Sequence, residues 1–165
     1  MSDPALKRIT QRLTSALDRD RLVYETTHDL RNTLKVDRVV LYYFYRHWTG
    51  QVTYEALQSK QFSILGSTGP DDCFNGDYAS WYEQGRIRAI DDIEIEPITP
   101  CHREFLQRLQ VRANLVVPVL NNLGLWGLLI AHNCQDTKHW QPADLDVMKA
   151  ASLALANSPS IANTN

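Results

Sequence analysis

The chain is organised around residues 100–119, which read PCHREFLQRLQVRANLVVPV. Thr99 just before them suits an N-cap, and the proline that follows suits the first helical position, where its missing N–H would have no partner anyway. Cys101, Phe105 and Leu109 recur every four residues, so the sulfur shares a helix face with two large apolar side chains. We therefore predict a helix here whose apolar face looks into a pocket or a core.

Cys101 has two interpretations on these residues alone. A thiol in the first turn of a helix lies at the positive end of the helix dipole, which favours the thiolate and lowers its pKa below the usual value of about 8.5. That environment suits a nucleophile. Alternatively, Cys101 is a small buried apolar residue, and His102 stands beside it by chance.

Length and composition indicate an ordinary soluble domain. The 165 residues fit one domain with a sizeable core, and 44% hydrophobic residues, 22% charged residues and a net charge of −2 are typical of globular proteins. The near-neutral charge argues against nucleic acid as a partner. No apolar run is long enough to span a membrane, and residues 1–10 lack the apolar core of a signal peptide. We therefore expect a cytoplasmic protein without membrane contact. Its three cysteines, Cys73, Cys101 and Cys134, are expected to be free thiols.

Two helical stripes begin the chain, and residues 18–21 interrupt them with alternating charges. We expect residues 1–21 to form an N-terminal helix, a signalling helix or coiled coil that could form a homodimer through the terminal helices or continue an upstream helix. Residues 22–157 then form the domain, and the Ser/Pro/Asn-rich residues 158–165 a disordered tail.

The rest of the chain alternates strand and helix patterns. Alternating or continuous apolar runs predict strands, and the continuous ones indicate central strands covered on both faces. Residues 59–75 form a long polar loop of the kind that is usually functional. Pro118 cannot donate to a strand ladder, so it is expected at a bulge or an unpaired edge. The predicted class is α+β, a central antiparallel sheet of five to six strands with helices on both faces. The predicted strands are 38–45, 51–56, 86–90, 115–120 and 125–131, and the later helices are 78–84, 100–109 and 142–155.

From about residue 22 to residue 155, the chain resembles the bilin-binding GAF domains of cyanobacteriochromes, photoreceptors of the phytochrome superfamily. The resemblance rests on the Cys101-His102 pair with Phe105-Leu106, and on ANLVVP at 113–118. It also rests on LWGLLIAH at 125–132 and on DDCF at 71–74, which is typical of the Asp-x-Cys-Phe dual-cysteine subgroup.

The resemblance implies a GAF fold and a reversible photoreceptor without catalytic activity. Cys101 would form a thioether with ring A of a linear tetrapyrrole, phycocyanobilin or phycoviolobilin, and His102 would pack against the pyrrole rings. The carboxylate of Asp71 would accept hydrogen bonds from pyrrole N–H groups. Cys73, beside Phe74 of the motif, would add reversibly to the bridge between the middle rings. That second thioether would give a blue-absorbing state, and breaking it a green- or longer-wavelength-absorbing state.

Other positions follow from the resemblance less directly. Arg86, or equally Arg88, would bind a bilin propionate. His132 would bind a propionate or the ring D carbonyl, unless it is a satisfied core histidine. Tyr78 would stack on ring D, although core packing explains it nearly as well. Cys134 matches no family role and is expected to be structural. The output domain, of histidine kinase, cyclase or chemotaxis type, is expected elsewhere in a full-length protein.

Alternatives from other classes remain open. A zinc site drawn from the cysteines and histidines lacks the usual two-to-four-residue gaps between ligands. A thiol redox enzyme on a GAF fold could use Cys73 and Cys101 as attacking and resolving thiols. A cyclic-nucleotide-binding GAF module would leave the Cys101-His102 pair without a role. Within the photoreceptor class, the colour change could instead arise from proton transfer, with Cys73 spectrally silent.

Overall fold

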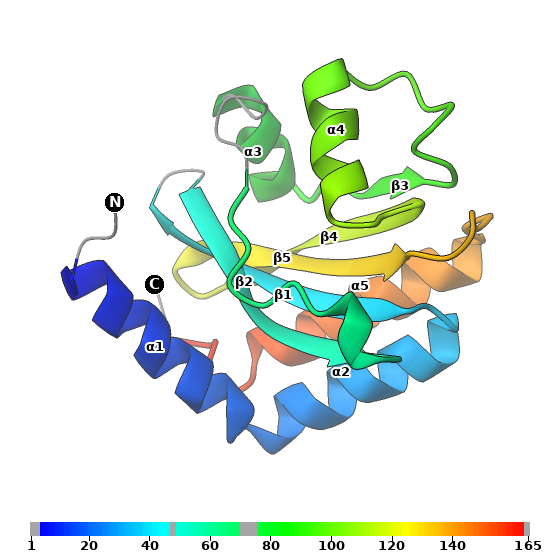
Figure 1. Ribbon diagram of the computed structural model, residues 1–165. Coiled ribbons are helices and arrows are strands. Elements are labelled where there is room, and N and C mark those ends of the chain that lie inside the picture. Colours follow the sequence, from blue (N-terminus) through cyan, green and yellow to red (C-terminus); the bar gives the residue numbers. More distant parts are fainter. Residues whose placement is uncertain (1–3, 47–48, 70–75, 164–165) are drawn as a thin grey trace.

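A computed structural model describes residues 4–46, 49–69 and 76–163 (Figure 1). It confirms the predicted α+β class: one antiparallel sheet with helices on both faces. The elements follow in the order α1 (Pro4–Asp18), α2 (Arg21–Leu34), β1 (Arg38–Arg46), β2 (Thr49–Leu57), the 3-10 turn η1 (Lys60–Phe62), α3 (Gly76–Glu83), β3 (Arg88–Ile90), α4 (Pro100–Arg108), β4 (Ala113–Asn121), β5 (Gly124–Asn133) and α5 (Pro142–Ala156).

The sheet has five strands in the order β2-β1-β5-β4-β3, so β5 lies in the middle. Ile130 of β5 is opposite Val40 of β1 on one side and Val116 of β4 on the other. The short β3 pairs with β4 only at residues 114–116. Among the described residues, Pro118 therefore has no partner strand on that side of β4, which confirms the unpaired edge position predicted for it.

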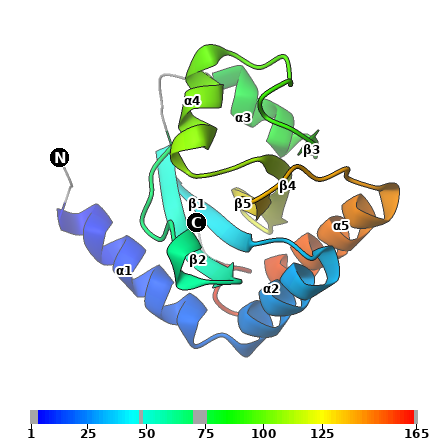
Figure 2. The same cartoon turned by 45° about the vertical axis from the view of Figure 1, so that its right-hand side comes forward.

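One face of the sheet packs against α1, α2 and α5 (Figures 1 and 2). Alternate residues of the central strands point to this face and are almost completely buried, among them Leu41, Leu115 and Leu129. Burying a leucine of this size contributes about 1.5–3 kcal/mol. This layer is the main hydrophobic core.

The predicted break between the first two helices is confirmed. The carboxylate of Asp20 caps α2 by accepting hydrogen bonds from the N–H groups of Leu22 (3.1 Å) and Val23 (3.3 Å). It also accepts one from the backbone N–H of Ser160 (3.1 Å). An aspartate at an N-cap satisfies helix donors that otherwise have no partner.

The described part of the C-terminal tail, residues 158–163, corrects the expectation of disorder. Ile161 is fully buried in the main core, and its carbonyl accepts a hydrogen bond of 2.6 Å from the side chain of Asn121. Composition alone predicted disorder because the segment has one isoleucine among mostly polar residues. In the structure, the burial of Ile161 and the hydrogen bonds between Ser160 and Asp20 hold the segment in place.

The other face of the sheet carries α3, α4 and the segment 64–69 (Figure 1). The N-terminus of α4 forms as predicted: the Thr99 hydroxyl accepts a hydrogen bond of 3.2 Å from the His102 N–H, and Pro100 occupies the first turn. The predicted short helix is α3, and it ends before Gly85, whose φ of +92° suits glycine. The sheet's second face is thus covered by elements that leave a cavity over its centre.

Candidate ligand site

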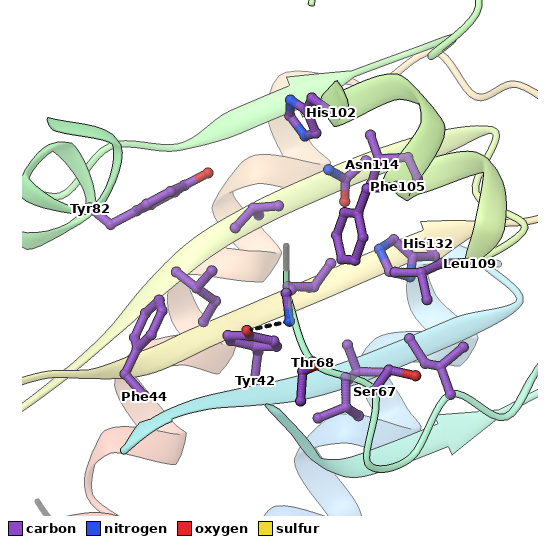
Figure 3. Close-up of a pocket in the computed structure, with 18 residues that line it drawn as sticks. Tyr42, Phe44, Ser67, Thr68, Tyr82, His102, Phe105, Leu109, Asn114 and His132 are labelled. Atoms are coloured by element: carbon purple, nitrogen blue, oxygen red, sulfur yellow. Dashed lines mark hydrogen bonds between the residues drawn. The ribbon is translucent and has the colours of Figure 1, made fainter. Parts of the chain in front are cut away.

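The cavity lies between the sheet, α4 and the segment 64–69 (Figure 3). Its volume is about 100 Å³, within about 870 Å³ of unoccupied space that includes open solvent. Val40, Tyr42 and Phe44 of β1 line it and alternate with the core residues Leu41 and Tyr43 on the opposite face. Strand β1, whose aromatic residues were predicted to be core on at least one face, therefore contributes to the main core on one face and to the cavity wall on the other. A long ligand would have to extend beyond the enclosed part.

Helix α4 contributes His102, Phe105 and Leu106 to the cavity wall, and its C-cap residue Leu109 also lines the cavity. The predicted pocket-facing stripe is confirmed for Phe105 and Leu109. Cys101 is exposed on the first turn, so it is not the buried apolar residue of the alternative interpretation. The structure records it as disulfide-bonded, unlike the free thiol expected, and Cys134 is the free cysteine among the described residues.

His102 is held as a neutral imidazole. Its side chain is only 7% exposed, and burial, together with the positive charges of Arg88 and Arg86, lowers its pKa to about 4. Each cause disfavours the protonated ring. At neutral pH the ring therefore presents an uncharged surface to the cavity, which suits packing against an apolar or aromatic ligand.

A row of polar residues crosses the otherwise apolar face of the sheet. Asn114 of β4 is opposite His132 of β5, and His132 is opposite Arg38 of β1. Arg38 is fully buried; its Nε donates to His132 Nδ1 at 3.1 Å, and its two terminal nitrogens donate to the carbonyls of Phe62 (2.6 Å) and Leu109 (2.7 Å). The predictions from sequence omitted Arg38 and Asn114 as site residues.

His132 combines the two roles left open for it. One ring nitrogen is satisfied by Arg38, as in a core histidine, but the side chain also lines the cavity. Complete burial and the neighbouring Arg38 charge hold its pKa well below the ordinary value of 6.5. The ring is therefore neutral at physiological pH and remains available to a ligand.

The two candidate cations lie near His102 but do not line the cavity. The guanidinium carbon of Arg86 stands 4.4 Å from the centre of the Trp81 ring. The Nε of Arg88 is buried and has no hydrogen-bond partner within the described part of the chain. Both charges act on His102. Arg88 therefore has a donor left over for an anionic group.

The remaining predicted residues lie partly or wholly outside the described region. Asp71, Cys73 and Phe74 are among residues 70–75, which the structure does not describe. Tyr78 belongs to α3, but its side chain is not described. Tyr82, one turn further along α3, is buried and lines the cavity. Residues four apart on a helix share one face, so the spacing from Tyr78 could have identified Tyr82 from the sequence.

The segment that leads to residues 70–75 is attached to the cavity wall. The Gly69 N–H donates a 2.8 Å hydrogen bond to the Tyr42 hydroxyl, which Figure 3 marks with a dashed line. A Cβ at Gly69 would stand only 2.6 Å from that oxygen. A larger residue would have to displace the Tyr42 hydroxyl, so glycine suits this close approach.

Two other expectations concern metals and membranes. Within residues 4–46, 49–69 and 76–163, no three His, Cys, Asp or Glu side chains gather where they could hold a metal ion. None of the described helices is long and apolar enough to cross a membrane.

Cys134 is partly buried; burial and the nearby Asp37 raise its thiol pKa to about 11 against the opposing effect of Arg38.

Sequence comparison relates the chain to cyanobacterial proteins. Residues 18–158 match the GAF domain family. The chain is 47% identical to an uncharacterized protein of Picosynechococcus sp. (strain PCC 7002), over 94% of this chain and 96% of that one. It is 36% identical to a putative methyl-accepting chemotaxis protein of Synechocystis sp. (strain PCC 6803), over 86% of this chain but only 14% of that protein's length.

Structural comparison gives the same relationship. A crystal structure of the cyanobacteriochrome receptor PixJ superposes with a TM-score of 0.75 at 33% identity, covering 84% of this chain and 94% of that one. The blue-light absorbing form of the Thermosynechococcus elongatus PixJ GAF domain superposes with a TM-score of 0.71 at 31% identity, covering 94% of this chain and 89% of the other.

Proposed function

The chain belongs to the GAF domain family and is closely related to the GAF domains of the cyanobacteriochrome PixJ, and from that premise we propose that it is a photosensory domain that binds a linear tetrapyrrole. The observation that carries the proposal is the apolar cavity over the sheet, lined by His102 immediately after an exposed cysteine in the first turn of α4. We assign no catalytic step to this domain.

Cys101 is the attachment residue in this proposal. Its sulfur adds to the side-chain double bond on ring A; the thiol proton goes to the neighbouring carbon, and the new bond is a thioether. This addition needs no oxidant, but it needs the free thiol, so a disulfide at Cys101 must first be reduced by a thiol reductant. The start of a helix favours the thiolate that attacks.

The cavity side chains then hold the pigment. The neutral His102 packs against the pyrrole rings, and Tyr82 and Phe105 provide apolar walls, with Tyr78 a further candidate for contact with ring D. Arg88, with Arg86 beside it, binds a propionate, because its buried Nε has no partner among the described residues and a guanidinium recognises carboxylates. Phycocyanobilin and phycoviolobilin are the proposed pigments.

The colour change is assigned to the second cysteine. Light isomerises the double bond between rings C and D, and the thiol of Cys73 bonds reversibly to the bridge between the middle rings. The bonded state absorbs blue light, and the released state absorbs green or longer wavelengths, because the conjugated system is whole again. Asp71 accepts hydrogen bonds from the pyrrole N–H groups, and Phe74 completes the motif. The existence of a blue-light absorbing form in the related PixJ GAF domain supports this assignment.

The signal leaves the domain through an output partner. Relatives with similar segments include a putative chemotaxis protein and circadian input-output histidine kinases, and the chain spans only 14% and 21% of the length of the first of each kind. We propose a chemotaxis, kinase or cyclase output domain, reached through the terminal helices, whose pairing with a second copy would form a homodimer.

The attachment test compares three cysteine variants co-produced with phycocyanobilin. Cys101→Ala should abolish or sharply reduce the zinc-induced fluorescence of the denatured protein. Cys134→Ala, which changes the other cysteine outside residues 70–75, should retain it. Undiminished fluorescence in Cys101→Ala would refute the attachment. Cys73→Ala should keep the bilin but lose the blue-absorbing state. A blue state that survives this change would favour proton transfer, and methionine sulfoxide reduction by the pigment-free protein would favour a thiol redox enzyme.

A further inference from the structure

Asn114 is a buried polar residue whose oxygen has no structural use in the described chain. The residue is 4% exposed and lines the cavity, and its Oδ1 has no hydrogen-bond partner among the residues that the structure describes. Figure 3 shows the carboxamide between the two histidines, with its oxygen on the His132 side and its nitrogen on the His102 side. A buried acceptor without a partner destabilises the fold, so its presence in a cavity wall indicates a ligand.

Arg38 determines which nitrogen of His132 carries the proton. A guanidinium has only donors and does not lose its proton in proteins. Because Arg38 Nε donates to His132 Nδ1, that nitrogen must be the acceptor, and the proton of the neutral ring is on Nε2. No described residue accepts a hydrogen bond from this Nε2–H. His132 therefore offers the cavity a donor.

The acceptor and the donor stand next to each other. Asn114 and His132 are directly opposite in the β4–β5 ladder, where neighbouring strands are about 4.8 Å apart. A group that satisfies both must offer a hydrogen-bond donor and a hydrogen-bond acceptor on the same edge. A carboxylate has only acceptors and would face the Asn114 oxygen unfavourably, and an inner pyrrole ring has an N–H without a carbonyl. A lactam has both.

We propose that Asn114 is a ligand-binding residue that forms, with His132, a two-point site for a lactam ring. Asn114 Oδ1 accepts the lactam N–H, His132 Nε2–H donates to the lactam carbonyl, and Arg38 is a positioning residue that keeps His132 in the required tautomer. This inference rests on the proposed function, because the terminal rings of a linear tetrapyrrole are lactams. The resemblance already implies a contact between His132 and the ring D carbonyl; the inference adds Asn114 as the acceptor of the lactam N–H and Arg38 as the positioning residue.

The test replaces Asn114 by leucine, which has similar size and no acceptor, and measures the protein with and without pigment. Without pigment, Asn114→Leu should unfold at the same or a higher temperature, because no described group loses a partner. With isotope-labelled phycocyanobilin, attachment should persist, but the N–H resonance of one terminal ring should move to the position of a weaker hydrogen bond. Asn114→Asp, which keeps an acceptor oxygen, should restore it.

Asn121→Leu is the matched control, since this asparagine lies on the same strand but bonds the Ile161 carbonyl away from the cavity. It should lower the unfolding temperature and leave both terminal-ring resonances unchanged. An unshifted lactam resonance in Asn114→Leu, or a loss of stability like that of Asn121→Leu, overturns the lactam site while the pigment remains bound. If the wild-type protein binds no bilin at all, the proposed function fails and the lactam site fails with it.

Discussion

Protonation of His102 should destabilise the pigment-free domain, and the structure gives the size of the effect. Burial, aided by Arg88 and Arg86, lowers the folded-state pKa from 6.5 to about 4. The unfolded chain therefore binds a proton at a pH where the folded chain does not. The stability contributed by the neutral ring is fully present above pH 6.5 and is lost as the pH falls toward 4. At about 1.36 kcal/mol per pKa unit, the loss approaches about 3 kcal/mol.

Urea unfolding of pigment-free protein in reductant, from pH 7.5 to pH 4, measures this term. Carboxylates also titrate in this range, so the quantity to follow is the difference between the wild type and His102→Gln. That difference should shift by about 3 kcal/mol in favour of the variant as the pH falls. A pH-independent difference for His102→Gln would contradict the buried neutral ring.

Two further variants test the fold around the cavity. Arg38→Met should reduce the free energy of unfolding by about 3 kcal/mol or more in urea titrations, because it leaves two buried carbonyls and an imidazole without their charged donor. Arg21→Met, which removes an exposed ion pair, should change the free energy of unfolding little. Equal effects of the two substitutions would refute the role of the buried arginine. Gly127→Ala should prevent soluble folding, because the added Cβ would stand 2.1 Å from the Tyr42 carbonyl oxygen. A soluble variant with the wild-type circular dichroism spectrum and unfolding temperature would contradict that packing.

Local sequence signals predicted most of the framework. The Thr99 cap, the apolar spacing of Phe105 and Leu109, and the continuous apolar runs of β4 and β5 each depend on neighbours within a few residues, and each appears in the structure as predicted. His102 and His132 were also identified as candidates, and both line the cavity.

The row from Asn114 through His132 to Arg38 could not be predicted in the same way. It depends on the register of three strands that are far apart in the sequence, and a shift of one residue would turn every side chain to the other face. Arg38 begins a strand, a place where a charged residue usually faces solvent, and only the carbonyls of Phe62 and Leu109 explain its burial. Asn114 was recognised as part of a motif but not as a site residue, because an unsatisfied oxygen is visible only once its surroundings are known.

Covalent attachment at Cys101 is the central claim, and peptide mass spectrometry tests it most directly. Trypsin should release residues 89–103 as one peptide that contains Cys101 and neither of the other two cysteines. After co-production with phycocyanobilin in reductant, the account predicts this peptide with one added bilin mass, and unmodified peptides containing Cys73 and Cys134 from the denatured long-wavelength state. An unmodified 89–103 peptide from pigmented protein, or the bilin mass on the Cys134 peptide, would contradict the account.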